Sequence, residues 1–228
     1  MMRTAVVNEV ELVFREEGSP DTPPLVLLHG RTADHNDWNG VTQHLAARHH
    51  VIAPDLRGHG GSGRPGHYAL PDMAEDIVAL LDHLGIERAT LVGHSMGGVV
   101  AYLLAMRHPG RVERLVVEDP PPPYPIEGRA PIVEDESTGF DWRMVHDTER
   151  QFLAPDPEWA RGLGRITAPT LVLSGGPSSH VRSEPLAERI PGARLVTIDA
   201  GHLIHVSARK AFLAEVDAFL DQGEREVS

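Results

Sequence analysis

The stretch Gly93-His94-Ser95-Met96-Gly97-Gly98 says most about the fold of this 228-residue sequence. It has the pattern G-x-S-x-G and stands between a short apolar run, 89–92, and a segment of small and apolar residues, 96–107. A serine on a sharp strand-to-helix turn projects its hydroxyl outward, and the glycines beside it remove side chains that would clash in such a turn. We therefore predict that Ser95 is a nucleophile, whereas the simpler alternative is an ordinary glycine-serine turn.

Outside this motif, apolar runs of strand length alternate with segments of helical periodicity. Such alternation predicts an α/β fold, in which a mostly parallel central sheet is flanked by helices. Nearly continuous apolar runs indicate strands that are buried on both faces. We expect an edge strand at 10–16, further strands at 24–29, 51–54, 89–92, 112–117, 170–173 and 194–198, and helices at 73–84, 96–107 and 207–220.

The stretch from 120 to 169 breaks this alternation. Four consecutive prolines at 120–123 exclude a regular helix or strand at its start. The apolar spacing over 140–153 predicts one amphipathic helix, which Pro155 would end. Because the stretch is too short for a core of its own, we predict a single core domain formed by 1–119 and 166–228. Residues 120–165 would be a short lid or cap inserted over one end of the sheet.

Composition excludes several classes of function. The chain has 33 acidic and 21 basic residues and a formal net charge of −12. This balance argues against nucleic acid and anionic membrane surfaces as partners, because both require basic patches. The absence of cysteine excludes a disulfide scaffold, a thiolate zinc site and a cysteine nucleophile. No apolar run approaches the 18 or so residues that span a bilayer, and no signal peptide is recognisable, so we expect a cytoplasmic protein.

Serine is a weak nucleophile unless a base takes its proton, and His202 is the best candidate for that base. It lies in Ala200-Gly201-His202-Leu203, after the last predicted strand and before the last predicted helix. The carboxyl ends of parallel strands meet at one edge of a sheet, so His202 is expected at the same edge as Ser95. His205 is an alternative base, although it is expected inside or beside the start of the helix.

These motifs occur in an order that resembles the α/β-hydrolase superfamily. They are His29-Gly30, the segment 55–62, the serine motif and Gly201-His202, and the resemblance extends over 24–220. It implies an α/β-hydrolase fold in which 55–62 is a structural loop and His29 braces the loop that follows it.

The resemblance also implies an oxyanion hole. In the superfamily, the residue after His-Gly and the residue after the nucleophile each supply one backbone N–H group. In this sequence those residues are Arg31 and Met96. No cofactor is implied.

The sequence departs from the superfamily at the acid that would orient His202. Most members carry that acid as Gly-x-x-Asp after the strand matching 170–173, but here residues 175–180 are Gly-Gly-Pro-Ser-Ser-His, without a carboxylate. A partner is still needed to hold the imidazole tautomer. Glu118-Asp119 ends the strand after the nucleophile strand, a placement similar to that in haloalkane dehalogenases. We predict Asp119 as the acid, with Glu118 and an incomplete triad as alternatives.

Two further residue groups near this acid allow other interpretations. We favour a simple turn for Ser178, Ser179 and His180 over a polar wall of the site. His180, His202 and Asp119 are also residue types that bind metal ions, but a catalytic triad explains two of these residues better, so we predict no metal.

A serine nucleophile with a histidine base indicates acyl transfer to water. We predict a serine hydrolase whose partner is a small to medium ester or lactone. The alternatives are a C–C bond hydrolase that uses the same triad and a ligand-sensing protein with weak turnover. Aromatic residues are candidates for the pocket lining: Trp38, Tyr124 and Trp142, together with Phe140 and Trp159. The sequence leaves the oligomeric state open.

Overall fold

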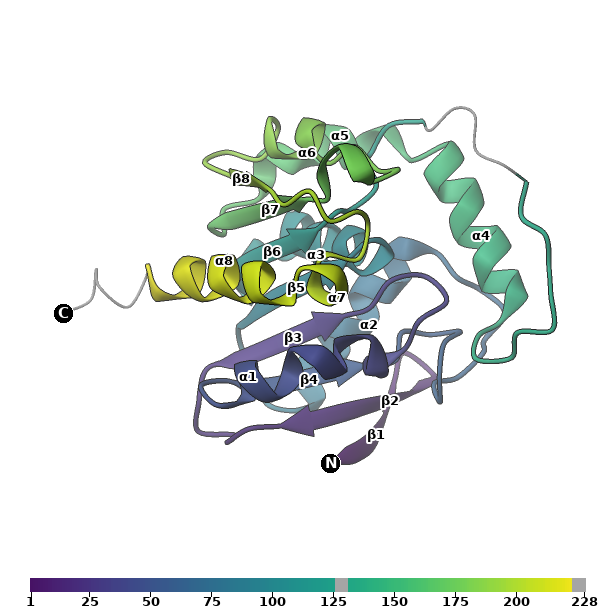
Figure 1. The fold of residues 1–228 in the computed structure, drawn as a ribbon. Helices are drawn as coiled ribbons and strands as arrows, with labels where there is room; N and C mark the ends of the chain where they lie inside the picture. The colour runs from purple at the N-terminus through teal and green to yellow at the C-terminus, as the bar shows by residue number, and fades with distance from the viewer. Residues whose placement is uncertain (126–130, 223–228) are drawn as a thin grey trace.

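In the computed structural model, which describes residues 1–125 and 131–222, eight strands form one sheet with helices on both faces (Figure 1). The strand order is β1-β2-β4-β3-β5-β6-β7-β8. The first two pairs in this order are antiparallel and all others are parallel, which confirms the predicted mostly parallel sheet. The strands are β1 (Met2–Val7), β2 (Val10–Glu17), β3 (Pro24–Leu28), β4 (His50–Pro54), β5 (Ala89–His94), β6 (Val112–Glu118), β7 (Thr170–Ser174) and β8 (Arg194–Thr197).

The prediction that 10–16 is the edge strand is wrong. β1 pairs outside β2 along its whole length, from Met2 opposite Arg15 to Val7 opposite Val10. Asn8 and Glu9 form the two-residue turn between them, and both have positive φ, 48° and 65°. This backbone conformation matches the twist of a tight hairpin, so the chain reverses immediately and adds one more strand.

Helices cover the two faces of the sheet in separate groups (Figure 1). α2 (Leu70–His83) and α3 (Met96–Arg107) contribute to the larger core cluster, and α1 (Thr42–Ala46) and α8 (Arg209–Asp221) to the other. α3 has the bounds that the sequence predicts, and all its residues except Arg107 are buried. The helix predicted from about 207 to 220 is α8, which begins at Arg209, and a separate short helix, α7 (Ile204–Ser207), precedes it.

The segment between β6 and β7 carries α4 (Trp142–Leu153) and α5 (Pro157–Gly162). The predicted helix over 140–153 is confirmed, and it begins at Trp142 because the Asp141 side chain accepts a hydrogen bond from the Arg143 amide and caps it. α4 lies beyond the sheet edge (Figure 1) and packs Met144, Val145 and Phe152 against the larger core cluster. The short remaining helices are η1 (His35–Gly40), η2 (Pro109–Arg111), η3 (Leu163–Arg165), η4 (Gly176–Ser178) and α6 (Glu184–Ala187).

The sheet register brings the carboxyl ends of three strands together. His94 of β5 lies opposite Glu118 of β6, and Glu118 lies opposite Leu173 of β7. The loops that leave these parallel strands therefore start side by side at one edge, where ligand sites of open α/β sheets are found. No helix in the described part of the chain has both the length and the apolar character to cross a membrane.

Candidate active site

Ser95 stands on a strained turn between β5 and α3, with φ 50° and ψ −115°. The turn leaves no room for side chains on either side. A Cβ atom at Gly93 would lie 2.4 Å from the Gly97 carbonyl oxygen, and one at Gly97 would lie 2.2 Å from the Leu28 carbonyl oxygen. The two glycines of the G-x-S-x-G pattern are thus required by packing, as the sequence analysis expects.

The structure brings Ser95, His202 and Asp119 into one hydrogen-bonded chain. His202 follows Gly201, which has a φ of 76°, in the loop between β8 and α7. Its Nε2 atom lies 2.9 Å from Ser95 Oγ, and its Nδ1 atom lies 2.7 Å from Asp119 Oδ2. This order of hydroxyl, imidazole and carboxylate is the arrangement that activates a serine.

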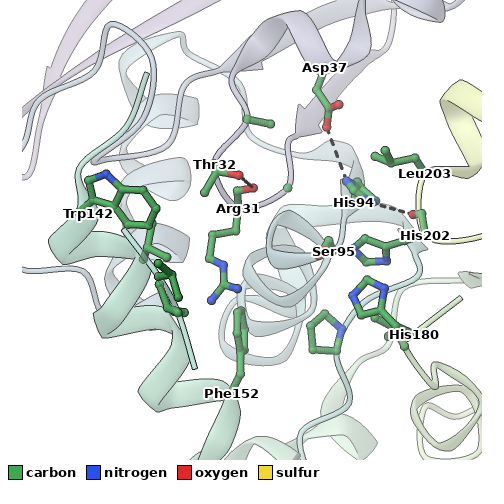
Figure 2. A pocket seen from close by; sticks show the side chains of 17 residues that line it. Arg31, Thr32, Asp37, His94, Ser95, Trp142, Phe152, His180, His202 and Leu203 are labelled. Carbon is green, nitrogen blue, oxygen red and sulfur yellow. Dashed lines mark hydrogen bonds and ion pairs between the residues drawn. The ribbon is translucent and has the colours of Figure 1, made fainter. Parts of the chain in front are cut away.

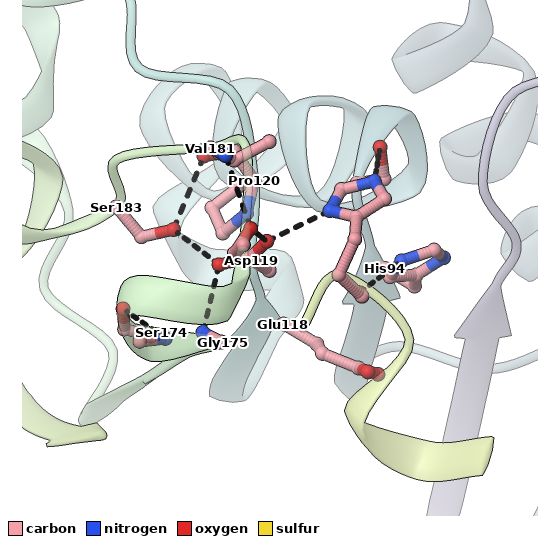
Figure 3. Close-up of polar contacts among 12 residues, drawn as sticks. His94, Glu118, Asp119, Pro120, Ser174, Gly175, Val181 and Ser183 are labelled. Carbon is pink, nitrogen blue, oxygen red and sulfur yellow. Dashed lines mark hydrogen bonds and ion pairs between the residues drawn. The ribbon is translucent and has the colours of Figure 1, made fainter. Parts of the chain in front are cut away.

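The Asp119 carboxylate is fully buried and accepts hydrogen bonds at both oxygens (Figure 3). Oδ1 accepts from the Gly175 amide at 2.9 Å and from Ser183 Oγ at 3.2 Å, and Oδ2 accepts from Ser179 Oγ as well as from His202. Burial by itself would raise the pKa of Asp119. The hydrogen bonds, led by those from His202 and Ser179, outweigh burial and hold that pKa below its usual value. Asp119 is therefore ionised and fixes the His202 tautomer that carries a proton on Nδ1.

The loop 175–180, which has no carboxylate of its own, supplies two hydrogen-bond donors to Asp119, the Gly175 amide and the Ser179 hydroxyl. The prediction of a simple turn at 178–180 is therefore wrong for two of its three residues. Ser179 donates to the Asp119 carboxylate, and His180 lines the pocket with its ring centre 4.5 Å from that of His202. Sequence analysis also missed Ser183, which no local pattern distinguishes from other loop serines.

Glu118 points away from His202 and binds His205. Its carboxylate oxygens lie 2.9 and 2.8 Å from His205 Nδ1, and it also accepts a hydrogen bond from the His205 amide at 2.9 Å. On the other side, His205 Nε2 lies 3.4 Å from Asp37. Burial by itself would lower the pKa of His205, but hydrogen bonds and charges of Asp37 and Glu118 raise it to about 10. His205 is thus a buried cation and does not compete with His202 for Ser95.

His94 links this buried group to the loop that carries His202. Its Nε2–H donates to the His202 carbonyl oxygen at 2.9 Å, and its Nδ1 lies 3.5 Å from Asp37 (Figure 2). Glu118, His205, Asp37 and His94 therefore form a continuous chain of charged and polar groups that ends on the backbone of His202. Sequence analysis did not identify this chain, because its members come from four separate segments.

Ser95 and His202 open into a pocket of about 630 Å³, whose walls include Trp142, Val145 and Phe152 of α4 (Figure 2). Trp142 thus lies where the sequence analysis expects it. Other apolar groups in the lining are Ile132, Val133, Val181 and Leu203.

The predictions for Trp38 and Tyr124 as pocket lining are wrong. Trp38 is fully buried on the far side of the site, with its ring centre 4.4 Å from that of His205 and 6.2 Å from that of Phe212. Tyr124 lies outside the pocket lining and packs its ring below the Arg189 guanidinium. Phe140 and Trp159 are likewise core residues.

The loop 29–31 runs beside Ser95. A Cβ atom on Gly30 would lie 3.6 Å from the Ser95 Cβ, and both Gly30 and Arg31 line the pocket. His29 braces this loop as expected, since its Nε2 accepts from the Leu56 amide at 3.0 Å and its Nδ1 donates to the Gly30 carbonyl at 2.8 Å. Met96 is the first residue of α3, where backbone N–H groups have no partner within the helix.

Among the described residues, the group whose possible metal-ligand atoms lie close together is not the one that the sequence suggests for a metal site. In the described part of the chain, the group with ligand atoms within 4.8 Å of one another is Asp34, His35 and Asp55, rather than His180, His202 and Asp119. Asp55 has a structural role in this group, because its carboxylate accepts hydrogen bonds from the His35 amide and from the Gly61 amide and so connects two loops.

The chain is similar to known proteins along most of its length. A family model described as alpha/beta hydrolase fold matches residues 23–162. The chain is 30% identical to an sn-1-specific diacylglycerol lipase of Danio rerio, over 96% of this chain and 84% of that protein. It is 26% identical to 3-oxoadipate enol-lactonase 2 of Acinetobacter baylyi, over 95% and 96% of the two chains. A solved structure of a membrane phospholipase A, described as a bacterial virulence factor, has a TM-score of 0.83 and 25% identity, covering 97% of this chain and 86% of that one.

Proposed function

The chain belongs to the α/β-hydrolase family, and on this premise we propose that it is a serine hydrolase that cleaves a small to medium carboxylic ester or lactone. The observation that supports this most directly is the hydrogen-bond chain from Ser95 Oγ through His202 to Asp119, which is open to the pocket at the serine. The relatives are named as a lipase and an enol-lactonase, and hydrolysis is common to both.

In the first half of the proposed reaction, Ser95 Oγ attacks the carbonyl carbon of the substrate while His202 Nε2 takes the hydroxyl proton. Negative charge develops on the carbonyl oxygen, and the amides of Arg31 and Met96 donate hydrogen bonds to it. Each such donor stabilises the transition state by about 3 kcal/mol. The C–O bond to the alcohol then breaks, and His202 gives its proton to the departing oxygen.

In the second half, water attacks the acyl group on Ser95 and His202 takes a proton from that water. The second tetrahedral intermediate breaks to release the carboxylic acid, and the proton returns to Ser95 Oγ. Asp119 remains ionised throughout and stabilises the imidazolium that forms in each half. Its four hydrogen-bond donors, His202 among them, suit this role because they favour the charged carboxylate.

We also propose that 120–165 forms a lid over the substrate, on the basis of its described parts, 120–125 and 131–165; residues 126–130 lie outside the described residues. α4 supplies Trp142, Val145 and Phe152 to the pocket, and these side chains offer apolar surface to an acyl or alcohol chain. A lid that also excludes water would strengthen the hydrogen bonds to the oxyanion.

The test is covalent labelling with a fluorophosphonate, followed by intact-mass measurement. We expect the wild type to gain one adduct and Ser95→Ala to gain none. Ser178→Ala, which removes a nearby exposed serine, serves as the matched control and should label like the wild type. A panel of 4-nitrophenyl esters and lactones should then show turnover by the wild type.

Two outcomes would contradict the proposal. A folded wild type that does not label would favour the ligand-sensing alternative. Labelling combined with slow ester turnover that does not depend on chain length would favour the C–C bond hydrolase.

A further inference from the structure

Besides its backbone, Arg31 brings a positively charged side chain into the pocket. Among the described residues that line the pocket, it is the only arginine or lysine, and Asp37 is the only carboxylate. Asp37 is held between His94 and His205. Arg31 instead extends across the cavity, from the side of Ser95 toward Phe152 (Figure 2). A substrate that reaches Ser95 therefore passes close to the guanidinium.

The guanidinium is held in place but retains unused donors. Its Nη1 donates to Glu149 Oε2 at 2.6 Å, and its Cζ lies 5.6 Å from the centre of the Phe152 ring. Both partners belong to α4, and the Arg31 side chain is 19% exposed. A guanidinium carries five N–H groups, and within the described residues the hydrogen bond from Nη1 to Glu149 is the one that it makes to protein. The remaining N–H groups are available to a ligand.

The surroundings favour an anion at this position. Glu149 already pairs with one side of the guanidinium. The other neighbouring walls are apolar side chains such as Trp142 and Val145, and beside apolar walls a charge interacts more strongly than it does in water. The net charge of −12 does not cancel this attraction, because distant surface charges are screened over about 8 Å. A planar guanidinium matches the two oxygens of a carboxylate better than an ammonium does.

We propose that the Arg31 side chain binds a carboxylate of the substrate, so that the preferred substrate is an ester of a dicarboxylic acid whose second carboxylate is free. The inference rests on the proposed serine hydrolase activity. The Arg31 amide would hold the oxygen of the reacting carbonyl, and its guanidinium would hold the far end of the same acyl chain. One residue thereby fixes both ends of the acyl group relative to Ser95.

The test compares two esters of equal chain length, mono-4-nitrophenyl glutarate and 4-nitrophenyl pentanoate. The first carries a free carboxylate and the second does not. We expect the wild type to prefer the glutarate ester in kcat/KM, and Arg31→Met to lower the ratio of the two values by about 10- to 100-fold, the usual effect of losing a charged hydrogen bond. Arg31→Lys should give an intermediate ratio, because it keeps the charge but loses the planar fork.

Arg150→Met is the matched control. Arg150 is an arginine of α4 itself that pairs with Asp147 of the same helix, and its side chain is 71% exposed. Its removal changes the net charge by the same amount, so the ratio should stay at the wild-type value.

The competing interpretation is that Arg31 only ties its loop to α4 through Glu149. In that case Arg31→Met would slow both esters equally, and an unchanged ratio would overturn the proposal. Glu149→Gln separates the two interpretations further. If Arg31 binds the substrate carboxylate, removing the neighbouring charge keeps or raises the preference for the glutarate ester.

A binding measurement distinguishes failure of this inference from failure of the proposed activity. If the wild type neither labels with the fluorophosphonate nor hydrolyses either ester, the activity proposal fails. Carboxylate binding by Arg31 can still be tested, because NMR titration measures the affinity of Ser95→Ala for monomethyl and dimethyl glutarate. Tighter binding of the monomethyl ester that disappears in Ser95→Ala/Arg31→Met supports carboxylate recognition, and equal binding of the two esters overturns it.

Discussion

Two acid–histidine pairs lie next to each other at the end of β6, and they have opposite properties. Glu118 and Asp119 are consecutive, and His202 and His205 are three residues apart. Asp119 lies 2.7 Å from the His202 ring, and Glu118 lies 2.8 Å from the His205 ring. Glu118 is the last residue of β6, and the chain turns at Asp119, whose φ is 45°, so the two acids reach different histidines.

The difference lies in what faces the second nitrogen of each imidazole. For His202 it is the Ser95 hydroxyl, and the His202 side chain is 22% exposed. For His205 it is a second carboxylate, Asp37, and the side chain is 1% exposed. An imidazole between two carboxylates keeps its proton, whereas one between a carboxylate and a hydroxyl can exchange it. The same chemical pair thus holds a fixed charge in one place and can transfer a proton in the other.

The largest difference between the two acid–histidine pairs should be in kcat, when each acid is replaced by its amide. Asp119→Asn should lower kcat on a 4-nitrophenyl ester by about 10⁴-fold, because the wrong imidazole tautomer then faces Ser95. In Glu118→Gln, kcat per folded molecule should stay within about tenfold of the wild type, a change that corresponds to one ordinary hydrogen bond. Equal losses in the two variants would show that both acids act on His202.

The next largest effect is on the free energy of unfolding. Here the pair that contains His205 should matter more than the pair that contains His202. His205→Ala leaves the buried Glu118 and the partly buried Asp37 without their shared cation, and removal of one partner from a buried pair costs about 3–5 kcal/mol. His202→Ala is the matched control, because Asp119 keeps three other donors in that variant. Urea unfolding followed by circular dichroism measures both values. A larger loss of stability in His202→Ala would contradict the assignment of His205 as the structural member.

The sequence predicts the parts of the fold that depend on local pattern. The elbow around Ser95 follows from steric requirements of neighbouring glycines, and α3 has the predicted bounds because every constraint on it is local. β1 was missed as a strand because only Ala5 and Val7 of its six residues are buried, so the apolar alternation is weak there. Ala208 has no helix-breaking side chain, and nothing in the sequence marks the interruption between α7 and α8.

The sequence predicts the position of a site residue only where the order of strands and helices along the chain determines it. Ser95 and His202 each follow a strand, so their common edge follows from the topology. Which of Glu118 and Asp119 binds His202 depends on how the segment that follows β8 packs against the end of β6, and that is a tertiary property. Trp38 shows the same limit, since an aromatic residue near the site suits a pocket wall and a core equally well, and its contacts with Phe212 decide for the core.

The buried cation should also make stability depend on pH. The pKa of His205 is about 10 in the folded protein, above its ordinary value near 6.5. A raised folded-state pKa contributes stability that is complete below the unfolded value and is lost as pH rises through the folded value. The free energy of unfolding should therefore decrease between pH 7 and 10. In Glu118→Gln the decrease should begin from a lower stability, end at a lower pH and be smaller in total, because the folded-state pKa of His205 is raised less. A wild type with constant stability over this range would contradict the charge assignment.

The smallest expected effect concerns His94, which joins the two pairs. Its hydrogen bond to the His202 carbonyl oxygen is its contact with the reacting side, and Asp37 is its contact with the buried side. Loss of one such hydrogen bond in His94→Ala should lower kcat/KM by about 2- to 10-fold, without the loss of stability expected for His205→Ala. His94→Gln, which keeps an N–H donor, should recover part of the rate. If His94→Ala were as damaging as Asp119→Asn, the two pairs would be one catalytic unit, because the buried charges would then act on His202 through His94.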